Sequence, residues 1–215
     1  MVVKEVKNLC FDLLKEKLVP LGYKPTKTGI KRFTKVNDLG FDEIWFGSVE
    51  YANLKMYKIY FYISVRIDAI EELKANFIKF VDENAKKRKP TCNINCGTFI
   101  GNHKLEFEIR TPEDVENAVA TFWNIYNEHA VEHIKKCYDI HFLNSLYPKY
   151  ANRCKDWLSV SDWFVAVPTI AFLADKPNFP TFRKSFMEYL INEMEMPEIR
   201  QKEVNAYLDK ITTEN

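Results

Sequence analysis

The sequence predicts an α+β protein, in which an N-terminal helix and an antiparallel sheet of about five strands precede an all-helical C-terminal half. Two observations carry this prediction. In several segments between residues 30 and 110, apolar side chains alternate with polar ones, which is the two-residue period of a strand. From Pro112 onward, apolar side chains instead recur every three or four residues, as in helices. We therefore divide the chain into an α+β sheet region, residues 1–111, and a helical region, residues 112–215, and expect one compact body because the junction lacks linker composition.

The sheet region opens with a predicted helix over residues 3–19, where apolar side chains recur every three or four positions. Three predicted strands follow, over residues 30–36, 42–51 and 54–67, with Asn53 at a tight turn between the last two. The third strand shows the clearest alternation, which predicts one buried face. The residues of that face are Tyr57, Ile59, Phe61, Ile63, Val65 and Ile67.

A second helix is predicted over residues 69–85, and the basic stretch 86–89 is expected to be a loop because a proline follows it. Two shorter strands are predicted over residues 92–96 and 105–109. The Gly-Asn pair at 101–102 is expected to turn the chain between them.

The helical region begins with a start signal, since Thr111 can cap a helix whose first residue is Pro112. This helix is expected to run to about Leu146. The next helix is expected to be kinked or split at Pro168. The later helices are predicted over residues 156–174, 181–194 and 197–211.

The composition narrows the classes of function. The formal net charge of the 215 residues is +1, so charge gives no argument for nucleic acid as a partner. The longest apolar stretch, residues 163–174, is too short to span a bilayer, and the first residues lack the apolar core of a signal peptide, so we expect no membrane association. Five cysteines without a tight spacing framework are typical of reduced thiols and predict a cytoplasmic protein.

Three of the four histidines and one cysteine follow one another at four-residue intervals, as His129, His133, Cys137 and His141. On one continuous helix they fall on the apolar stripe, so the row is expected to face the protein body or a partner. The spacing of four is also how a helix presents two ligands to one metal ion, which makes His129 and His133 a candidate zinc pair. The competing interpretation, which the sequence favours, is that these histidines belong to the core or to an interface.

The face of the third strand opposite its buried side carries Tyr60, Tyr62 and Arg66, and the neighbouring strand offers Trp45. Aromatic side chains with an arginine on a sheet can stack on nucleic-acid bases or bind a protein. The balanced charge disfavours nucleic acid, so these four residues are the predicted binding residues for a protein partner. The alternative is that the helical region covers this face.

The opening helix, the turn Leu18-Val-Pro-Leu-Gly-Tyr-Lys24 and the following strand with Phe33 resemble a set of small bacterial α+β domains of unknown function. The step at residues 147–148 and the apolar stretch 171–174 fit the same order of elements. The chain departs from the group at residues 63–65, where Ile-Ser-Val replaces the Asn-Leu-Gly often seen on the sheet. The resemblance implies the α+β fold and a bacterial cytoplasmic setting, and it implies no catalytic residues.

The sequence contains no complete catalytic or cofactor signature. We therefore expect a non-enzymatic protein-binding module, of which an accessory or immunity-type protein is one form. The alternative is a metal-binding domain or metal-dependent hydrolase that uses His129 and His133. A third possibility is a small-ligand pocket between the sheet and the long helix, lined by His133, Cys137 and Tyr60. The oligomeric state is not indicated by the sequence.

Overall fold

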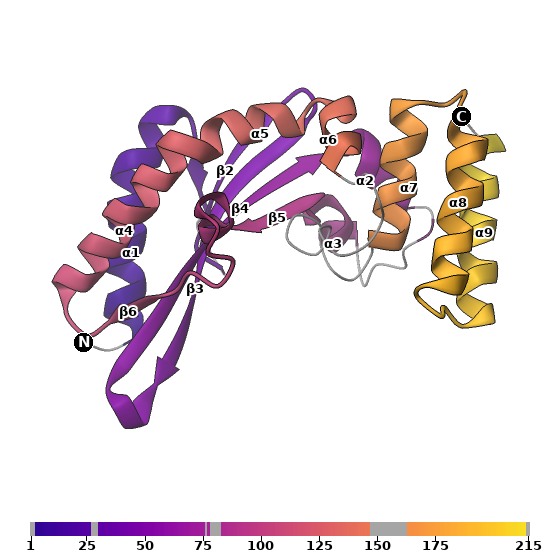
Figure 1. Cartoon of the computed structure of the whole chain (residues 1–215). Coiled ribbons are helices and arrows are strands. Elements are labelled where there is room, and N and C mark those ends of the chain that lie inside the picture. The colour runs from indigo at the N-terminus through magenta and orange to yellow at the C-terminus, as the bar shows by residue number, and fades with distance from the viewer. Residues whose placement is uncertain (1–2, 27–29, 76, 78–82, 147–162, 214–215) are drawn as a thin grey trace. The chain divides into compact units, whose positions relative to one another are not determined.

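The computed structural model describes residues 3–26, 30–75, 77, 83–146 and 163–213 (Figure 1). It confirms the α+β class, with an N-terminal helix, an antiparallel sheet and a helical C-terminal half. The first helix, α1, spans Val3–Leu18, close to the predicted range. Within the described part of the chain, no helix is long and apolar enough to cross a membrane.

The chain divides into two compact units, and each unit takes segments from both halves of the sequence. The division between the units does not fall at residue 111. The helix that follows this residue, α4 (Pro112–Ile125), packs against α1 and β6 and belongs to unit 1. The prediction of one compact body stays a prediction. Unit 1 comprises Met1–Val65 and Asn93–Lys135, and unit 2 comprises Arg66–Cys92 and Lys136–Asn215.

The strands pair in the order β1-β2-β3-β4-β5, and β6 pairs with β4 beside this path. The turn expected at Gly101 does not join β5 to β6 as a hairpin, because the chain first forms a short 3-10 helix over Cys96–Ile100. β1 was not predicted, since a two-residue strand is too short to show alternation. The strands are β1 (Lys24–Pro25), β2 (Arg32–Asn37), β3 (Gly40–Tyr51), β4 (Met56–Ile67), β5 (Cys92–Asn95) and β6 (Phe107–Ile109).

The alternation of β4 places its predicted face in the core, where the Phe61 and Ile63 side chains are fully buried. Two helices cover this face in unit 1 (Figure 1). The Phe122 ring of α4 stacks on Phe61 with 4.6 Å between ring centroids, and the Phe11 ring of α1 stacks on Phe33 of β2 at 4.8 Å. Both helices therefore lie on the same side of the sheet in unit 1.

The start of α4 forms as predicted. The Thr111 hydroxyl accepts a hydrogen bond from the Asp114 backbone N–H, and the Asp114 carboxylate accepts one from the Thr111 backbone N–H. The predicted continuous helix to Leu146 is instead interrupted. A π-helical turn over Tyr126–Ala130 follows α4, and α5 (Val131–Cys137) ends before α6 (Ile140–Leu146) begins.

Unit 2 is built mainly from helices, and α7 packs against α2, α6, α8 and α9. The loop expected at residues 86–89 is wrong in part, because residues 86–88 form the last turn of α3, where basic side chains suit the helix dipole. Pro168 lies inside α7 without splitting it, and the Thr169 hydroxyl donates to the Val165 carbonyl at 2.7 Å. Residues 156–162 of the predicted helix lie outside the described residues. The remaining helices are α2 (Asp68–Ala75), α3 (Glu83–Arg88), α7 (Trp163–Ala174), α8 (Phe179–Asn192) and α9 (Glu198–Thr213).

Candidate functional site

Three of the predicted binding residues come together on the sheet of unit 1. Trp45 of β3 and Tyr62 of β4 stack with 4.3 Å between ring centroids and 13° between ring planes, and the Tyr60 ring lies 6.4 Å from Tyr62. All three side chains are half-buried. They lie on the side of the sheet opposite α1 and α4, because they alternate with the core residues of their strands. We call this group, Trp45, Tyr60 and Tyr62, the aromatic face.

A glycine gives Tyr60 its position. A Cβ atom on Gly47 would lie 3.2 Å from Cδ2 of Tyr60, so the tyrosine ring rests on the bare backbone of β3. An aromatic ring over a strand glycine covers backbone that would otherwise meet water. Sequence reasoning missed Gly47, although a single glycine inside an alternating strand is the pattern that signals close approach.

Hydrogen bonds fix the indole of Trp45. Its Nε1 donates to the Ser64 hydroxyl at 3.1 Å, and that hydroxyl donates to Oδ1 of Asn93 at 2.8 Å. The hydroxyls of Tyr60 and Tyr62 have no hydrogen-bond partner in the described part of the chain, so both can serve a ligand. Partial burial, followed by the nearby Tyr51 and Glu106, raises the pKa of Tyr60. Its hydroxyl therefore keeps its proton and can donate.

Charged residues flank the aromatic face, and they neutralise one another. Arg32 is the cross-strand neighbour of Trp45 and donates to Glu43 at 3.1 Å. On the other side, Lys58 forms an ion pair with Glu106. A centre of aromatic rings with a polar, charge-balanced rim is the usual composition of a protein–protein interface.

Arg66, the fourth predicted binding residue, does not join the aromatic face. Its residue is 6% exposed, and its guanidinium donates to the Asp68 carboxylate at 2.6 Å and to the carbonyls of Lys86 and Lys89 at 2.9 Å. Through these bonds Arg66 holds the last turn of α3 and the residue that follows it, all within unit 2. The alternation of a strand could not distinguish Arg66 from Tyr60 and Tyr62, because all three have even numbers and are expected on the same side of β4.

The histidine row is divided between different environments. The His129 side chain is 44% exposed, His141 is exposed, and Cys137 is fully buried. His129 and His141 therefore do not face the core of the protein, and the alternative that the row faces a partner stays a prediction. The π-helical turn adds a residue and shifts the helix phase by about 100°, and His141 lies on α6, beyond the end of α5.

The two histidines of the candidate zinc pair also differ. His129 lies at the end of the π-helical turn with its Nε2 3.8 Å from the Glu128 carboxylate. His133 is half-buried, and its ring meets Phe99 edge-to-face with 5.4 Å between centroids. Among the residues that the structure describes, no group of three or more His, Cys, Asp or Glu could hold a metal ion. Zinc binding by this pair stays a prediction.

The described cysteines are free and buried, which limits their chemistry. A hydrogen bond with Cys92, followed by burial, raises the pKa of the Cys137 thiol. Burial raises the pKa of Cys96 to about 12 and that of Cys10 as well. Thiols held in the protonated form are poor nucleophiles and poor metal ligands at neutral pH. Tyr60, which the sequence grouped with Cys137 in a ligand pocket, lies on the aromatic face against Gly47.

Comparison with known protein families, with curated proteins and with solved structures finds no match to this chain. The resemblance to small bacterial α+β domains therefore stays a prediction.

Proposed function

We propose that this protein is a non-enzymatic protein-binding module and that the aromatic face is its recognition surface. The observation that carries the proposal is the arrangement of Trp45, Tyr60 and Tyr62, three half-exposed rings held in fixed positions on a sheet face. Tyrosine and tryptophan supply most of the binding energy in many interfaces, because they bury a large area and lose little rotamer freedom.

The preorganisation of these rings supports binding. The Trp45 indole is already hydrogen-bonded through Ser64 to Asn93, and Tyr60 already rests on Gly47. A partner would therefore meet side chains that need little further ordering, which lowers the entropic cost of association. Removing one well-packed aromatic anchor from an interface costs about 2 kcal/mol or more.

The charges near the aromatic face support a protein rather than a nucleic acid as the partner. Arg32 and Lys58 at its rim are each paired with a glutamate of the same face. The nearby lysines that make no ion pair among the described residues, Lys4, Lys7 and Lys31, line a pocket that shares Trp45 with this face. Nucleic-acid binding draws its affinity from basic groups that are available to phosphates. An accessory or immunity-type role, in which the module holds another protein, agrees with these features.

Substitution on the aromatic face tests the proposal. Partners captured from the cells that make the protein are purified, and their affinity is measured by titration calorimetry against wild type, Tyr60→Ala and Tyr62→Ala. We expect the dissociation constant to rise about 30-fold for each variant, since about 2 kcal/mol is lost. The control is Leu21→Ala, which shortens a side chain that is 42% exposed in the short 3-10 turn after α1, outside the sheet.

The control should bind as tightly as wild type, and all variants should keep the wild-type circular dichroism spectrum. Equal affinity of the tyrosine variants and wild type would remove the aromatic face from the interface. Unfolding of both Tyr60→Ala and Tyr62→Ala would show that the rings belong to the core, and the proposal would fail.

A further inference from the structure

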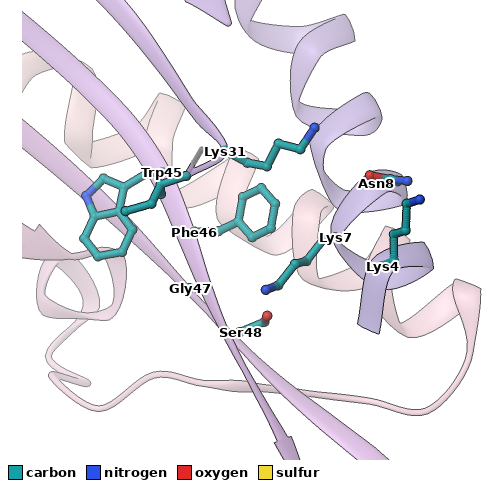
Figure 2. Close-up of a pocket in the computed structure, with 9 residues that line it drawn as sticks. Lys4, Lys7, Asn8, Lys31, Trp45, Phe46, Gly47 and Ser48 are labelled. Carbon is teal, nitrogen blue, oxygen red and sulfur yellow. The ribbon is translucent and has the colours of Figure 1, made fainter. Parts of the chain in front are cut away.

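A pocket lies at the edge of β3 beside the aromatic face, entirely within unit 1 (Figure 2). The first two turns of α1 contribute Lys4 and Lys7, β3 contributes Phe46 and Ser48, and Lys31 approaches from the residue before β2. Its volume is about 750 Å³. This volume falls in the range of about 300 to 1,000 Å³ that is usual for pockets that hold small molecules.

The charge of the pocket is wholly positive. Lys4, Lys7 and Lys31 line it, and none of its lining residues is acidic. In the described part of the chain, none of these three lysines makes an ion pair, whereas Lys58 and Lys135 pair with glutamates. Three unneutralised ammonium groups around one hollow create a positive potential that attracts an anion.

The floor of the pocket is apolar. The Phe46 ring, which is 5% exposed, lies between Lys7 and Lys31 in Figure 2. The aliphatic stems of the lysines add to this surface. The ammonium of Lys31 also lies over the Phe11 ring, 4.5 Å from its centroid. A bound molecule would therefore meet hydrocarbon below and cations at the rim.

One polar group in the pocket is unsatisfied. The Ser48 hydroxyl oxygen is buried and has no hydrogen-bond partner among the described residues. Figure 2 shows Lys7 reaching from α1 toward this hydroxyl. A buried hydroxyl without a partner costs about 1 to 3 kcal/mol, and an anionic oxygen between Lys7 and Ser48 would accept from both.

We propose that this pocket binds a small organic anion that has a flat apolar body and a carboxylate or phosphate group. The anionic group is held between Lys7 and Ser48, Lys4 and Lys31 add positive potential at the rim, and the apolar body lies against Phe46. Trp45 lines both the pocket and the aromatic face. The proposal does not depend on the proposed protein-binding function, because its charged residues lie on α1 and before β2.

Three probes with the same naphthalene body test the ligand class. 2-Naphthoate, 2-naphthyl phosphate and the neutral 2-naphthalenemethanol are titrated into the full chain at low ionic strength, with backbone amide shifts recorded by NMR. We expect at least one anion to bind about tenfold or more tightly than the neutral alcohol, because only the anions form charge-assisted hydrogen bonds. The tighter anion identifies carboxylate or phosphate, and the largest shifts should include Lys7, Phe46 and Ser48.

Lysine variants locate the site. Lys7→Gln and Lys31→Gln should each weaken the tighter anion about fivefold or more and leave the neutral probe unchanged. The matched control is Lys15→Gln, which removes an exposed lysine from the same helix outside this pocket and should have no effect. Dispersed amide spectra confirm that each variant is folded.

Several results would overturn the proposal: equal binding of the neutral probe, unchanged affinity in Lys7→Gln and Lys31→Gln, shifts that fall outside the pocket, or no binding of any probe. None of these results concerns Tyr60 or Tyr62, so the protein-binding proposal is tested separately by its own experiment.

Discussion

At the scale of single residues, the contacts around Gly47 and Trp45 explain why the aromatic rings are fixed before any partner arrives. The missing side chain of Gly47 lets Tyr60 lie on the strand, and the Ser64 hydroxyl holds the indole of Trp45. Both contacts lie on the side of the sheet away from α1 and α4, and Ser64 itself is buried. We infer that these contacts hold the half-exposed rings in place for a partner.

A second residue pair shows the opposite behaviour, because it serves stability. Lys74 of α2 is 1% exposed and donates to the Glu71 carboxylate at 2.7 Å. Removing one member leaves a buried charge, so Lys74→Met is expected to lower the free energy of unfolding by about 3 to 5 kcal/mol. Urea unfolding measures this change.

Two further variants make this prediction specific. Lys202→Met breaks an ion pair with Glu198 in which both side chains are well exposed, and it should change the free energy of unfolding by less than about 1 kcal/mol. Glu71→Gln combined with Lys74→Met removes both buried charges and should be less destabilising than Lys74→Met alone. Similar losses in Lys74→Met and Lys202→Met would contradict the prediction.

At the scale of elements, the capping box of α4 links folding to pH. The backbone N–H groups of Arg110 and Thr111 donate to the Asp114 carboxylate and lower its pKa below the ordinary value of 3.8. A lowered carboxyl pKa contributes stability that is present above 3.8 and is lost as the pH falls through the folded-state value.

Asp114→Asn tests this link. The variant is expected to be less stable than wild type at pH 7, and the difference should shrink as the pH is lowered below about 4. Thermal melting between pH 7 and pH 2 measures it, with Glu113→Gln, the exposed neighbour in the same turn, as the control. A difference that stays constant over this range would mean that the Asp114 charge plays no part in the cap.

The elements also show how far the sequence could predict the fold. The alternation along β4 predicted its core face, and the start signal at Thr111 predicted the first residue of α4, because both depend on local chemistry. The π-helical turn over Tyr126–Ala130 carries no comparable local signal, so the sequence pattern predicts one continuous helix where the structure has an interrupted one, and the residues of the histidine row differ in exposure. The partner of β6 depends on the path of the whole chain, and the sequence pattern did not reveal it.

The candidate site was also predictable from the sequence only in part. Strand parity predicted that Trp45, Tyr60 and Tyr62 share a face, since residues of one parity lie on one side of a sheet. The pocket that holds Lys4 and Lys31 could not be predicted, because it joins residues far apart in the chain and depends on how α1 lies against the sheet.

At the scale of the whole molecule, charged side chains are unevenly distributed although the net charge is near zero. The chain carries 31 basic and 30 acidic residues, yet three lysines and no acidic residue line the pocket beside α1. The rim of the aromatic face is balanced instead. Unit 1 therefore presents two surfaces of different chemistry, one suited to a protein partner and one suited to a small anion.

Photo-crosslinking asks directly whether the aromatic face contacts another protein. A benzophenone amino acid replaces Val49 in one variant and Leu21 in another. Val49 is 42% exposed on β3, on the same side of the sheet as Trp45, and Leu21 is 42% exposed in the short 3-10 turn after α1. Both variants are irradiated in the cells that make the protein. We predict a discrete crosslinked protein at position 49 and none at position 21. Absence of a crosslink at position 49, or the same products from both positions, would contradict the proposed interface.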